Sequence, residues 1–567
     1  MTAPAALLDR LRDIVGRRKV LTAPRATARF REGYRTGSGA ALAVVLPGTL
    51  VELWRVAQAC VAADVSIIMQ ASNTGLTGGS TPSGDDYPGG VVIISTVRLK
   101  GIHLVRDAEQ VVCLAGATLN ELERALLPLG REPHSVIGSS CLGASVVGGV
   151  CNNSGGSLIQ RGPAFTQLAL FGMIGDDGSL SLVNHLGIDL GNEPEAMLHR
   201  LDTGAFGAAE VDGCSDRWAH DRSYVSHVRK IDSDRPARFN ADSRCLFEAA
   251  GSAGKLIVFA VRLDTFPKEE GSVTFYLGTN DPAKLTTLRR TILGTFEHLP
   301  IAGEYMHRAV FDIADRYGKD MFAAIKRIGT ARLPHLFAAK ARFDSWARRL
   351  GPAGAHLSDR LMQRIGRLLP DHLPPRMRDY RDRFEHHLIL KVPGSAAAAT
   401  RALLASQFDD AASGFFECTA QEAADAFLHR FVAAGAAVRY RAVHAHEVED
   451  IVALDIALPR NARQWVEELP DDIAGDILHR LYYGHFFCHV FHQDYIVRKG
   501  VDPLALEHRM LEILDARGAE YPAEHNVGHL YHAKPVLADF YRSLDPTNRF
   551  NPGIGHMPRN RHWKQIT

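Results

Sequence analysis

The 567-residue sequence has almost no excess of charge, because 65 Lys and Arg residues face 64 Asp and Glu residues. Proteins that bind nucleic acid over a large surface need a basic excess, so we expect no nucleic-acid partner. The eight cysteines include no CxxC pair and lie mostly inside apolar runs. They are therefore predicted to be reduced thiols of a cytosolic protein rather than a set of disulfide bonds.

Long apolar runs are also missing. Charges are spread through residues 1–21, which argues against a secretory signal and predicts a short amphipathic helix. One uncharged stretch runs for 26 residues from Ser135 to Gln160, but it holds six glycines and six serines. Such a composition makes a poor lipid-facing helix, so we expect no segment that crosses a membrane.

This uncharged stretch is better suited to a loop that approaches a ligand closely. Glycines adopt positive φ and leave backbone N–H groups accessible, and short polar side chains add further donors. A second segment of the same kind, VSIIMQASNTGLTGGSTPSG (Val65 to Gly84), is an apolar strand that ends in a Gly/Ser/Thr loop. The pair predicts a cradle for a large polar cofactor that carries phosphates; plain glycine-rich turns are the alternative.

Two common nucleotide motifs are absent. The nearest match to GxGxxG begins at Gly37 and fails at its third glycine. The segment AAGSAGKLIVF imitates a P-loop, but Ala249 replaces the first glycine and Leu256 replaces Ser or Thr. A Rossmann dehydrogenase and a P-loop NTPase are therefore both disfavoured.

The chain is long enough for two or three domains. Strand-rich alternation from about residue 40 to Asp264, with helices at residues 51–63 and 119–129, predicts an α+β domain. The second of these helices has Thr118 as its N-cap and Glu121 at its third position. The strand GSVTFYLGTN and the helix AKLTTLRRTILGTF open another α+β unit, which we expect to run past a long helix around Ile473 to Phe491.

A basic stretch interrupts this second unit. Between His307 and Arg383 the chain carries 17 Lys/Arg and 8 Asp/Glu, whereas the other 490 residues carry 48 and 56. Prolines divide the stretch into short helices such as HLSDRLMQRIGRLL, and the second unit resumes at HHLILKV. The contrast in charge marks a separate segment of the protein.

Several strings resemble known flavoproteins. QASNTGLTGGSTP and GSSCLGASVVGGVCNNSGGS are similar to the two flavin loops of FAD-linked oxidases of the vanillyl-alcohol oxidase (PCMH) type. REPHSVIGSSC, NNSGGSLIQRGPA, AGEYMHR, HLPPRM, YYGHF and YPAEHNVGHLY resemble the quinone-dependent D-lactate dehydrogenases of bacterial respiratory chains, from about residue 20 to Gly555. The resemblance implies an α+β fold with a PCMH-type FAD-binding domain (1–264 and 516–567), an α+β cap domain (265–306 and 384–515) and a basic, helical membrane-binding segment (307–383).

The resemblance also implies FAD as the cofactor. The positions that match the flavin contacts are Ala71, Ser72, Asn73, Thr74, Gly75, Gly79, Ser80, Gly138, Ser145, Gly155 and Val258. Some relatives tether FAD through a histidine or cysteine of the first loop, and ASNTGLTGGSTP has neither. FAD is therefore expected to be non-covalent, with Cys141 and Cys151 of the second loop as packing residues.

Oxidation of a 2-hydroxy acid needs a base for the hydroxyl proton, and histidine suits that role near neutral pH. In the wider flavoenzyme family an E-H-G-[VI]-G motif supplies a metal-binding glutamate and a catalytic histidine. The matching segment begins at Glu524, which makes His525 the expected base, although Asn526 departs from the family glycine. His529 and His444 are the next candidates, and a hydrogen-bonded structural histidine is the alternative for His525.

A metal site stays open at this point. The wider family pairs the glutamate with two histidines in a GHxGDGNxH segment, for which RYRAVHAHEVEDIVALDI offers His444, with His446 as a substitute for the second. Glu524 and His444 alone are too few ligands for a divalent ion. For the substrate carboxylate an arginine fork is expected, with Arg441 as the first candidate and Arg308 as the reserve.

Two further histidine sets are present. His485, His489 and His492 have the spacing of one helical face and could bind zinc, but the phenylalanines between them favour a buried helix whose histidines are hydrogen-bonded or line a substrate pocket. His386 and His387 precede the strand LILKV, so one ring must face each side of that strand.

The expected function is oxidation of D-lactate to pyruvate, with ubiquinone or menaquinone as the electron acceptor. Another D-2-hydroxy acid, such as glycolate or D-2-hydroxyglutarate, and a flavin-carrying membrane adaptor are the alternatives. Because a quinone resides in the bilayer, residues 307–383 are expected to dock on an anionic phospholipid surface at the cytoplasmic side of the inner membrane, with Phe337, Phe343, Trp346 and Leu350 in the headgroup layer. A solvated basic face or a nucleic-acid patch is the alternative for this segment.

Overall fold

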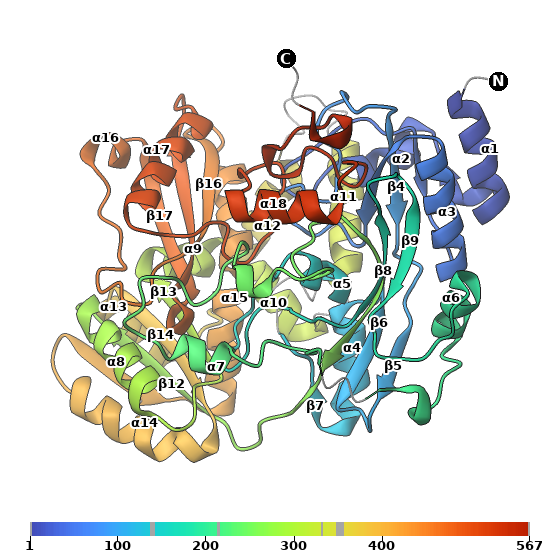
Figure 1. The fold of residues 1–567 in the computed structure, drawn as a ribbon. Helices are drawn as coiled ribbons and strands as arrows, with labels where there is room; N and C mark the ends of the chain where they lie inside the picture. The colour runs from blue at the N-terminus through green and yellow to red at the C-terminus, as the bar shows by residue number, and fades with distance from the viewer. Residues whose placement is uncertain (1–2, 136–141, 213–215, 330–332, 348–355, 565–567) are drawn as a thin grey trace.

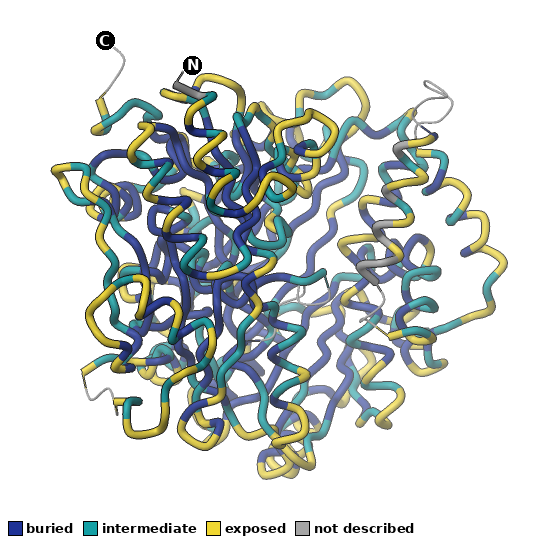
Figure 2. The backbone as a smooth tube through the Cα atoms, turned by 90° about the vertical axis from the view of Figure 1, so that its right-hand side faces the viewer, coloured by how far each residue is buried: buried dark blue, intermediate teal, exposed yellow. Residues whose placement is uncertain are grey.

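The computed structural model describes residues 3–135, 142–212, 216–329, 333–347 and 356–564. These residues form two sheet-bearing halves that lie side by side, the first built from the N-terminal part and the second from residues 273–498 (Figure 1). Buried backbone runs through the strands of both halves, and exposed residues gather in peripheral loops and helices (Figure 2). The six cysteines among the described residues are free thiols, as predicted.

A four-stranded sheet opens the first half and carries the first glycine-rich loop. Its order is β1 (Val20–Leu21), β2 (Ala43–Val45), β4 (Val91–Ser95) and β3 (Ser66–Gln70), and β2, β4 and β3 run parallel. The crossover α3 (Leu50–Ala62) has Thr49 as its N-cap, and the Thr49 hydroxyl accepts from the backbone N–H of Glu52. Because β3 ends at Gln70, the loop 71–80 starts at the carboxyl edge of parallel strands, where α/β sheets bind ligands.

A five-stranded antiparallel sheet completes the first half. Its order is β5 (Ile102–Val105), β6 (Gln110–Leu114), β10 (Ile257–Asp264), β8 (Ala169–Ile174) and β9 (Leu180–Asn184). The predicted capping box of α4 (Leu119–Leu126) is confirmed at Thr118 and Glu121. The second glycine-rich segment enters α5 (Val146–Cys151), where the Ser145 hydroxyl accepts from Gly148 N. The remaining elements of this half are α1 (Ala3–Val15), α2 (Pro24–Arg31), α6 (Pro194–Thr203), β7 (Arg131–Glu132) and β11 (Phe266–Pro267). The short helix α7 (Tyr224–Val228) instead packs through Tyr224 and Val228 into a core of the second half.

The second half is a seven-stranded antiparallel sheet between two layers of helices. Its order is β15 (Ser413–Glu417), β12 (Val273–Thr279), β14 (His386–Val392), β13 (Ala302–His307), β17 (Ile477–His485), β18 (Val490–Arg498) and β16 (Val448–Ala457). Alternate side chains of β12 enter different cores. Phe275 packs with α8 (Pro282–Thr295), α14 (Gly394–Gln407) and α17 (Pro503–Ala516), whereas Tyr276 packs with α9 (Arg308–Tyr317) and α15 (Ala420–Val443). The predicted division of His386 and His387 between the two faces is confirmed, because their rings bond Tyr305 and Tyr276 respectively.

The basic segment enters and leaves the sheet between two neighbouring strands. β13 and β14 pair directly, and the described residues between them in sequence form five helices: α9 (Arg308–Tyr317), α10 (Lys319–Ile328), α11 (Leu333–Ala347), α12 (Leu357–Leu368) and α13 (Pro375–Arg383). α9, α10 and α13 pack on one face of the sheet beside α15 (Ala420–Val443), whereas α12 packs on α9, α10 and α15, and α11 packs on α12. The predicted short helices and the interruption of the second unit are thereby confirmed. Among the residues that the structure describes, no helix is both long enough and apolar enough to span a bilayer.

The long helix predicted around Ile473 to Phe491 is wrong. After the single turn of α16 (Asp471–Ala474), the chain forms the hairpin of β17 and β18 instead. Aromatic and β-branched residues are frequent in this segment, and they favour a strand that packs on both faces. His485, His489 and His492 therefore do not share a helical face: His489 bonds the Pro459 carbonyl within the core, whereas the other two lie on the paired strands.

The C-terminal segment returns to the first half. Ile67 of β3 donates its N–H to Arg549 O and accepts from Asn551 N, which adds this segment to the sheet edge after α18 (Pro535–Leu544). Lys255, from the P-loop imitation, is fully buried and donates to Asn548 Oδ1 at 2.9 Å and to Phe550 O at 2.8 Å. That lysine anchors the C-terminal segment rather than a phosphate.

Candidate active site

Four ionisable side chains form a row across four adjacent strands of the seven-stranded sheet. Glu304 of β13 lies opposite His485 of β17, and His492 of β18 lies opposite Asp455 of β16. Side chains on a strand alternate between its two faces, and the strand register places these four on the same face as Tyr483. Tyr483 belongs to the core that α9 and α15 cover, so all four lie on that face of the sheet. The His485 and His492 rings are 5.5 Å apart between centroids.

The loop after α17 places Glu524 and His525 over this row. Ala523 N donates to the backbone carbonyl of Asp455 at 3.0 Å, which holds the loop beside β16. The Asp455 carboxylate then accepts from the backbone N–H groups of Glu524 at 2.7 Å and His525 at 3.1 Å. A single buried aspartate therefore fixes the position of both motif residues.

Glu524 also meets the first half of the molecule. Its carboxylate pairs with the buried guanidinium of Arg238, which in turn donates to the carbonyls of Gly156 and Leu158 in the second glycine-rich loop. A Cβ on Gly155 would collide with the Glu524 side chain, so this position requires glycine. The carboxylate thus joins the flavin loop to the seven-stranded sheet.

Asn526, which departs from the family glycine, also contacts both predicted flavin loops. Its amide Nδ2 donates to Asn152 Oδ1 at 2.7 Å, and a Cβ on Gly79 would lie 2.8 Å from its side chain. Gly79 leaves room for the larger residue, which explains how the departure is accommodated.

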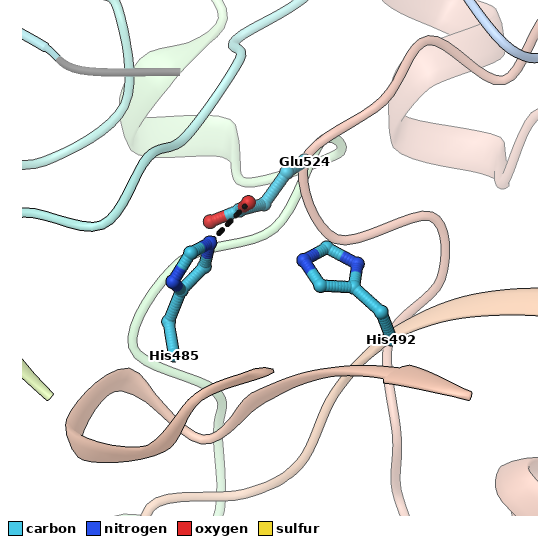
Figure 3. Close-up of side chains that lie close together, drawn as sticks. All are labelled: His485, His492 and Glu524. Atoms are coloured by element: carbon cyan, nitrogen blue, oxygen red, sulfur yellow. Dashed lines mark ion pairs between the residues drawn. The ribbon is translucent and has the colours of Figure 1, made fainter. Parts of the chain in front are cut away.

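His485, His492 and Glu524 form a candidate metal site, and the close-up shows the two rings and the carboxylate converging (Figure 3). One donor atom of each lies within 4.8 Å of the others. Two imidazoles and one carboxylate are the donor set of many catalytic zinc sites, and Glu304 supports His485 through Nδ1 at 2.6 Å as second carboxylates do in such sites. The residues fit a divalent ion, with His485 and His492 rather than His444 as the histidine ligands.

Negatively charged carboxylates alternate with positively charged side chains in the cluster. Burial lowers the pKa of His485, but the flanking carboxylates of Glu304 and Glu524 outweigh it and raise the pKa to about 10. Burial raises the pKa of Glu524, but Arg238 and His485 outweigh it and leave the pKa below its usual range. Burial raises the pKa of Glu304 as well, but His485 and Arg430 outweigh it and lower the pKa, so both carboxylates are ionised at neutral pH. A pKa of about 10 means that His485 carries a proton at that pH, which a metal ion would displace on binding.

His525 is oriented as a base. Its Nδ1 lies 2.7 Å from Asp455 Oδ2, which places the proton on Nδ1 and leaves Nε2 as the acceptor. Burial lowers the pKa of His525, but the charge and hydrogen bond of Asp455 and the charge of Glu524 outweigh it, so that the pKa is raised. The side chain is 31% exposed, so a substrate can reach it.

The predicted flavin loops fit a phosphate-bearing cofactor. Ser72 donates to the Gly143 carbonyl, so the two loops touch, and a Cβ on Gly75 would meet nothing within 4 Å. Gln70 Oε1 and Asn153 Oδ1, which border the two loops, are buried and have no hydrogen-bond partner among the described residues. Open glycine backbone beside such polar atoms is what a cradle for a large polar ligand requires. Gly138 and Cys141 lie outside the described residues.

The remaining predicted flavin contacts border the same loops. Asn73 adopts a φ of 54°, and its Oδ1 accepts from the Ser80 hydroxyl at 3.1 Å. Ser145 and Val258 are buried, and Gly155 touches Glu524. Ala71 and Thr74 are half-buried within the first loop.

Other residues predicted for catalysis have partners other than Glu524 and His525. Arg441, near the end of α15, pairs with Asp450, and Arg308 pairs with Glu385 at 2.9 Å. His444 caps α15 and bonds the Tyr317 hydroxyl at 2.8 Å. His529 does lie near the first flavin loop, where its N–H donates to Thr77 O at 2.9 Å, and burial lowers its pKa.

The sequence did contain a signal for the two histidines of the cluster. Gly484-His485 and His492 have the spacing of the first and last histidines in GHxGDGNxH, although the residues between them differ. Asp455 and Glu304 carried no such signal, because only the strand register brings them into the row.

Comparison with known proteins identifies the family. A family model described as FAD binding domain matches residues 41–181, and one described as D-lactate dehydrogenase, membrane binding, matches residues 274–563. The quinone-dependent D-lactate dehydrogenase of Escherichia coli (strain K12) is 57% identical over 563 residues, which cover 99% of this chain and 98% of the relative. This chain belongs to the quinone-dependent D-lactate dehydrogenase family. The member from Haemophilus influenzae is 54% identical over 99% of both chains, and the member from Corynebacterium glutamicum is 46% identical over 98% of this chain and 97% of its own.

Solved structures show the fold of this family member. p-Cresol methylhydroxylase with bound substrate aligns with a TM-score of 0.59 at 11% identity and 98% coverage of both chains. Alkyldihydroxyacetonephosphate synthase aligns with a TM-score of 0.56 at 11% identity, covering 97% of this chain and 84% of the other. The predicted PCMH-type α+β fold is confirmed, and FAD is the cofactor of this family member.

Proposed function

We propose that this chain oxidises D-lactate to pyruvate and passes the two electrons to a membrane quinone. The observation that carries the proposal is identity of 57% over 99% of the chain to a relative named for that activity. The ordered Asp455–His525 pair beside the flavin loops supports it, because a passive flavin carrier needs no base.

The proposed chemistry uses His525 as the general base. Nε2 accepts the hydroxyl proton of the substrate, and Asp455 stabilises the imidazolium that forms. Bound FAD supplies the hydride acceptor for the hydrogen on the substrate carbon. Arg238 keeps Glu524 ionised and fixed, and both side chains are nearly inaccessible to water, at 2% and 8% exposure.

A divalent ion would be held by His485, His492 and Glu524. Such an ion would lower the pKa of the substrate hydroxyl, which would assist the transfer of its proton to His525. Elemental analysis of the purified protein tests this part of the proposal. About one equivalent of metal that is lost in Glu524→Gln is the expected result, and a metal-free protein of full activity would remove it.

We also propose the FAD contacts and the domain limits that the family resemblance implies. The loops at 71–80 and 143–155 are proposed to hold the cofactor, with residues 1–264 and 516–567 as its domain. The return of the C-terminal segment to β3 supports that grouping.

The proposed membrane contact is the outer face of the basic segment. On α12 three apolar side chains at helical spacing are exposed, Leu361, Ile365 and Leu368, and Arg360, Arg364 and Arg367 flank them. None of the three arginines pairs with a carboxylate in the described part of the chain. Exposed cations beside an apolar stripe suit an anionic phospholipid surface. Phe343 and Trp346 of α11 are likewise exposed, whereas the side chains of Phe337 and Leu350 lie outside those described.

The proposal places this surface on the cytoplasmic side of the inner membrane and leaves ubiquinone and menaquinone as rival acceptors. Steady-state assays with D-lactate, glycolate and D-2-hydroxyglutarate against soluble analogues of both quinones test substrate and acceptor together. The highest kcat/KM is expected for D-lactate. A higher kcat/KM for either of the other acids would overturn the substrate assignment.

A further inference from the structure

Helix α15 buries its charges and exposes apolar side chains. Between Glu422 in its first turn and Arg441 in its last, the charged and histidine side chains are all buried, namely those of Asp425, His429, Arg430 and Arg439. The outward side over the same length, which we call the α15 face, consists of exposed Ala424, Phe431, Ala434, Gly435 and Val438 with half-buried Phe427 and Leu428 beside them. A helix that faces water has the opposite arrangement, so the α15 face suits an apolar partner.

Contacts of the buried residues show which way the α15 face points. Asp425 pairs with Lys326 of α10 at 2.8 Å, and the His429 ring lies 4.3 Å from the Phe311 ring of α9 between centroids. Phe431 and Val438 lie about half a turn around the helix from these two residues. The α15 face is therefore directed away from α9 and α10. A Cβ on Gly435 would meet nothing within 4 Å among the described residues, so this side of the helix is uncovered there.

The middle of α15 passes beside the candidate active site. Arg430 pairs with Glu304 at 3.2 Å, and its guanidinium lies 4.4 Å from the centre of the Tyr483 ring. Glu304 in turn bonds His485, a residue of the candidate metal site. Phe431, the exposed aromatic residue of the α15 face, directly follows Arg430 in the chain.

Helix α12 adds its own apolar stripe to the same side. The Arg439 guanidinium of α15 donates to Asp359 at 2.9 Å and lies 3.9 Å from Met362 Sδ, so the two helices pack together there. On α12, Gln363 donates to the Arg316 carbonyl of α9 at 2.9 Å. The exposed residues Leu361, Ile365 and Leu368 lie about half a turn from Gln363 and therefore also face away from α9.

The cations of α12 do not share this apolar side. Arg360, Arg364 and Arg367 lie about half a turn from Met362, the residue that contacts α15, so they point away from α15. The apolar residues of α12 and the α15 face thus form an uncharged surface on one side of the helix pair, with the arginines along its outer margin. An uncharged surface selects an uncharged ligand rather than an anionic headgroup.

We propose that the α15 face binds the isoprenoid tail of the quinone acceptor and guides the quinone from the membrane contact at α12 toward the flavin. The inference rests on the proposed function, because it names where the acceptor of that reaction binds. A prenyl chain has no polar group to satisfy, and side chains such as Phe431 and Val438 gain free energy when it covers them. Leu142, which follows the uncertain part of the second flavin loop, packs on the same core as Phe427 and Leu428. The proposed path therefore begins at the membrane helix α12 and ends at the core that the flavin loop joins.

The test compares two quinones with the same ring, one with a ten-carbon tail and one without a tail, in the FAD-loaded protein without vesicles. Phe431→Ser combined with Val438→Ser should raise KM for the tailed quinone roughly 10- to 100-fold, the range for two apolar side chains that lose contact with a ligand. KM for the tail-less quinone and the rate of flavin reduction by D-lactate should each change by less than about twofold, because neither depends on the tail. Leu504→Ser combined with Val536→Ser is the matched control, since both residues are likewise exposed and apolar, and it should leave both KM values unchanged.

Equal increases in KM for the two quinones would overturn the proposal, as would an unchanged KM for the tailed quinone. Sedimentation with vesicles tests phospholipid as the occupant instead: a double variant that loses vesicle binding but keeps its KM for the tailed quinone would assign the α15 face to lipid and overturn the proposal. Equilibrium dialysis of the tailed quinone with the oxidised protein needs no turnover, and the double variant should bind it at least tenfold more weakly. Unchanged affinity in dialysis would count against the α15 face, whereas slow turnover of D-lactate by the unaltered protein would count only against the proposed function.

Discussion

Replacement of Asp455 by Asn tests the arrangement of the proposed base. Asp455 accepts from two backbone N–H groups and from His525 Nδ1 at 2.7 Å. Asn keeps an oxygen for the backbone but removes the charge. A hydrogen bond to a charged group contributes about 1.5–3 kcal/mol and a neutral one about 0.5–1.5 kcal/mol, so the lost charge alone costs about tenfold in the rate of flavin reduction. If the amide NH₂ turns toward His525 and imposes the wrong tautomer, the loss approaches about 10³-fold or more.

Stopped-flow reduction of the flavin by D-lactate measures this rate directly. Because Asp455 raises the pKa of His525, and the base must be deprotonated to act, activity falls as pH drops through that pKa. The acid limb of kcat/KM should therefore move to lower pH in Asp455→Asn. Asp494→Asn is the matched control, since Asp494 is also buried and bonds the Tyr483 hydroxyl at 2.7 Å. A change of less than about threefold, or the same shift of the acid limb in the control, would refute the reasoning.

Further predictions concern the base, the buried lysine and the membrane surface. His525→Ala should lower turnover about 10²–10⁴-fold with FAD still bound. The double variant with Asp455→Asn should lose little more turnover than His525→Ala alone. Near-normal turnover in His525→Ala would make His529 the next candidate for the base. Lys255→Met should lower the free energy of unfolding by about 1–3 kcal/mol, because buried acceptors lose their donor. Burial lowers the pKa of Lys255 from 10.5 to about 7, so between these pH values the unfolded state binds more protons than the folded state. The free energy of unfolding of the unaltered protein should therefore rise with pH in this range relative to that of Lys255→Met. Denaturant titrations in which the two proteins show the same pH dependence of this free energy would contradict the prediction. Replacement of Arg360, Arg364 and Arg367 by Gln should weaken binding to anionic vesicles in sedimentation roughly 100-fold at low salt, at about 1 kcal/mol per cation removed. Neutral vesicles are the control, and unchanged binding would place the anchor elsewhere.

The sequence predicted the parts of this structure whose signals are local. Three such signals are the glycine-rich loops after apolar strands, the capping box at Thr118 and the charge contrast of residues 307–383. Each lies within one segment of the chain and predicts the structure of that segment. The segment that carries His485 and His492 forms a hairpin where its sequence predicts a helix. Histidines spaced four and three apart satisfy helical periodicity, and the same segment also alternates well enough for a buried strand. Hydrophobic periodicity does not separate those two states when both faces are buried.

The residues that support Glu524 and His525 are brought to the site by the pairing of strands that are distant in sequence. No local sequence pattern therefore predicts them. Asp455 and Glu304 belong to strands that are far apart along the chain, and their roles follow from which strands become neighbours. Arg238 shows the same limit, since it meets Glu524 only after the two halves come together. Motif matching could identify Glu524 and His525, but it could not identify what orients them.

Anaerobic titration of the FAD-loaded protein tests the central claim most directly. D-lactate should bleach the flavin absorbance stoichiometrically, with one pyruvate formed for each flavin reduced, and an equal concentration of L-lactate should leave the spectrum unchanged. The same titration with His525→Ala should reach the same end point about 10²–10⁴-fold more slowly. A flavin that D-lactate fails to reduce, or that is reduced at the same rate with and without His525, would contradict the account.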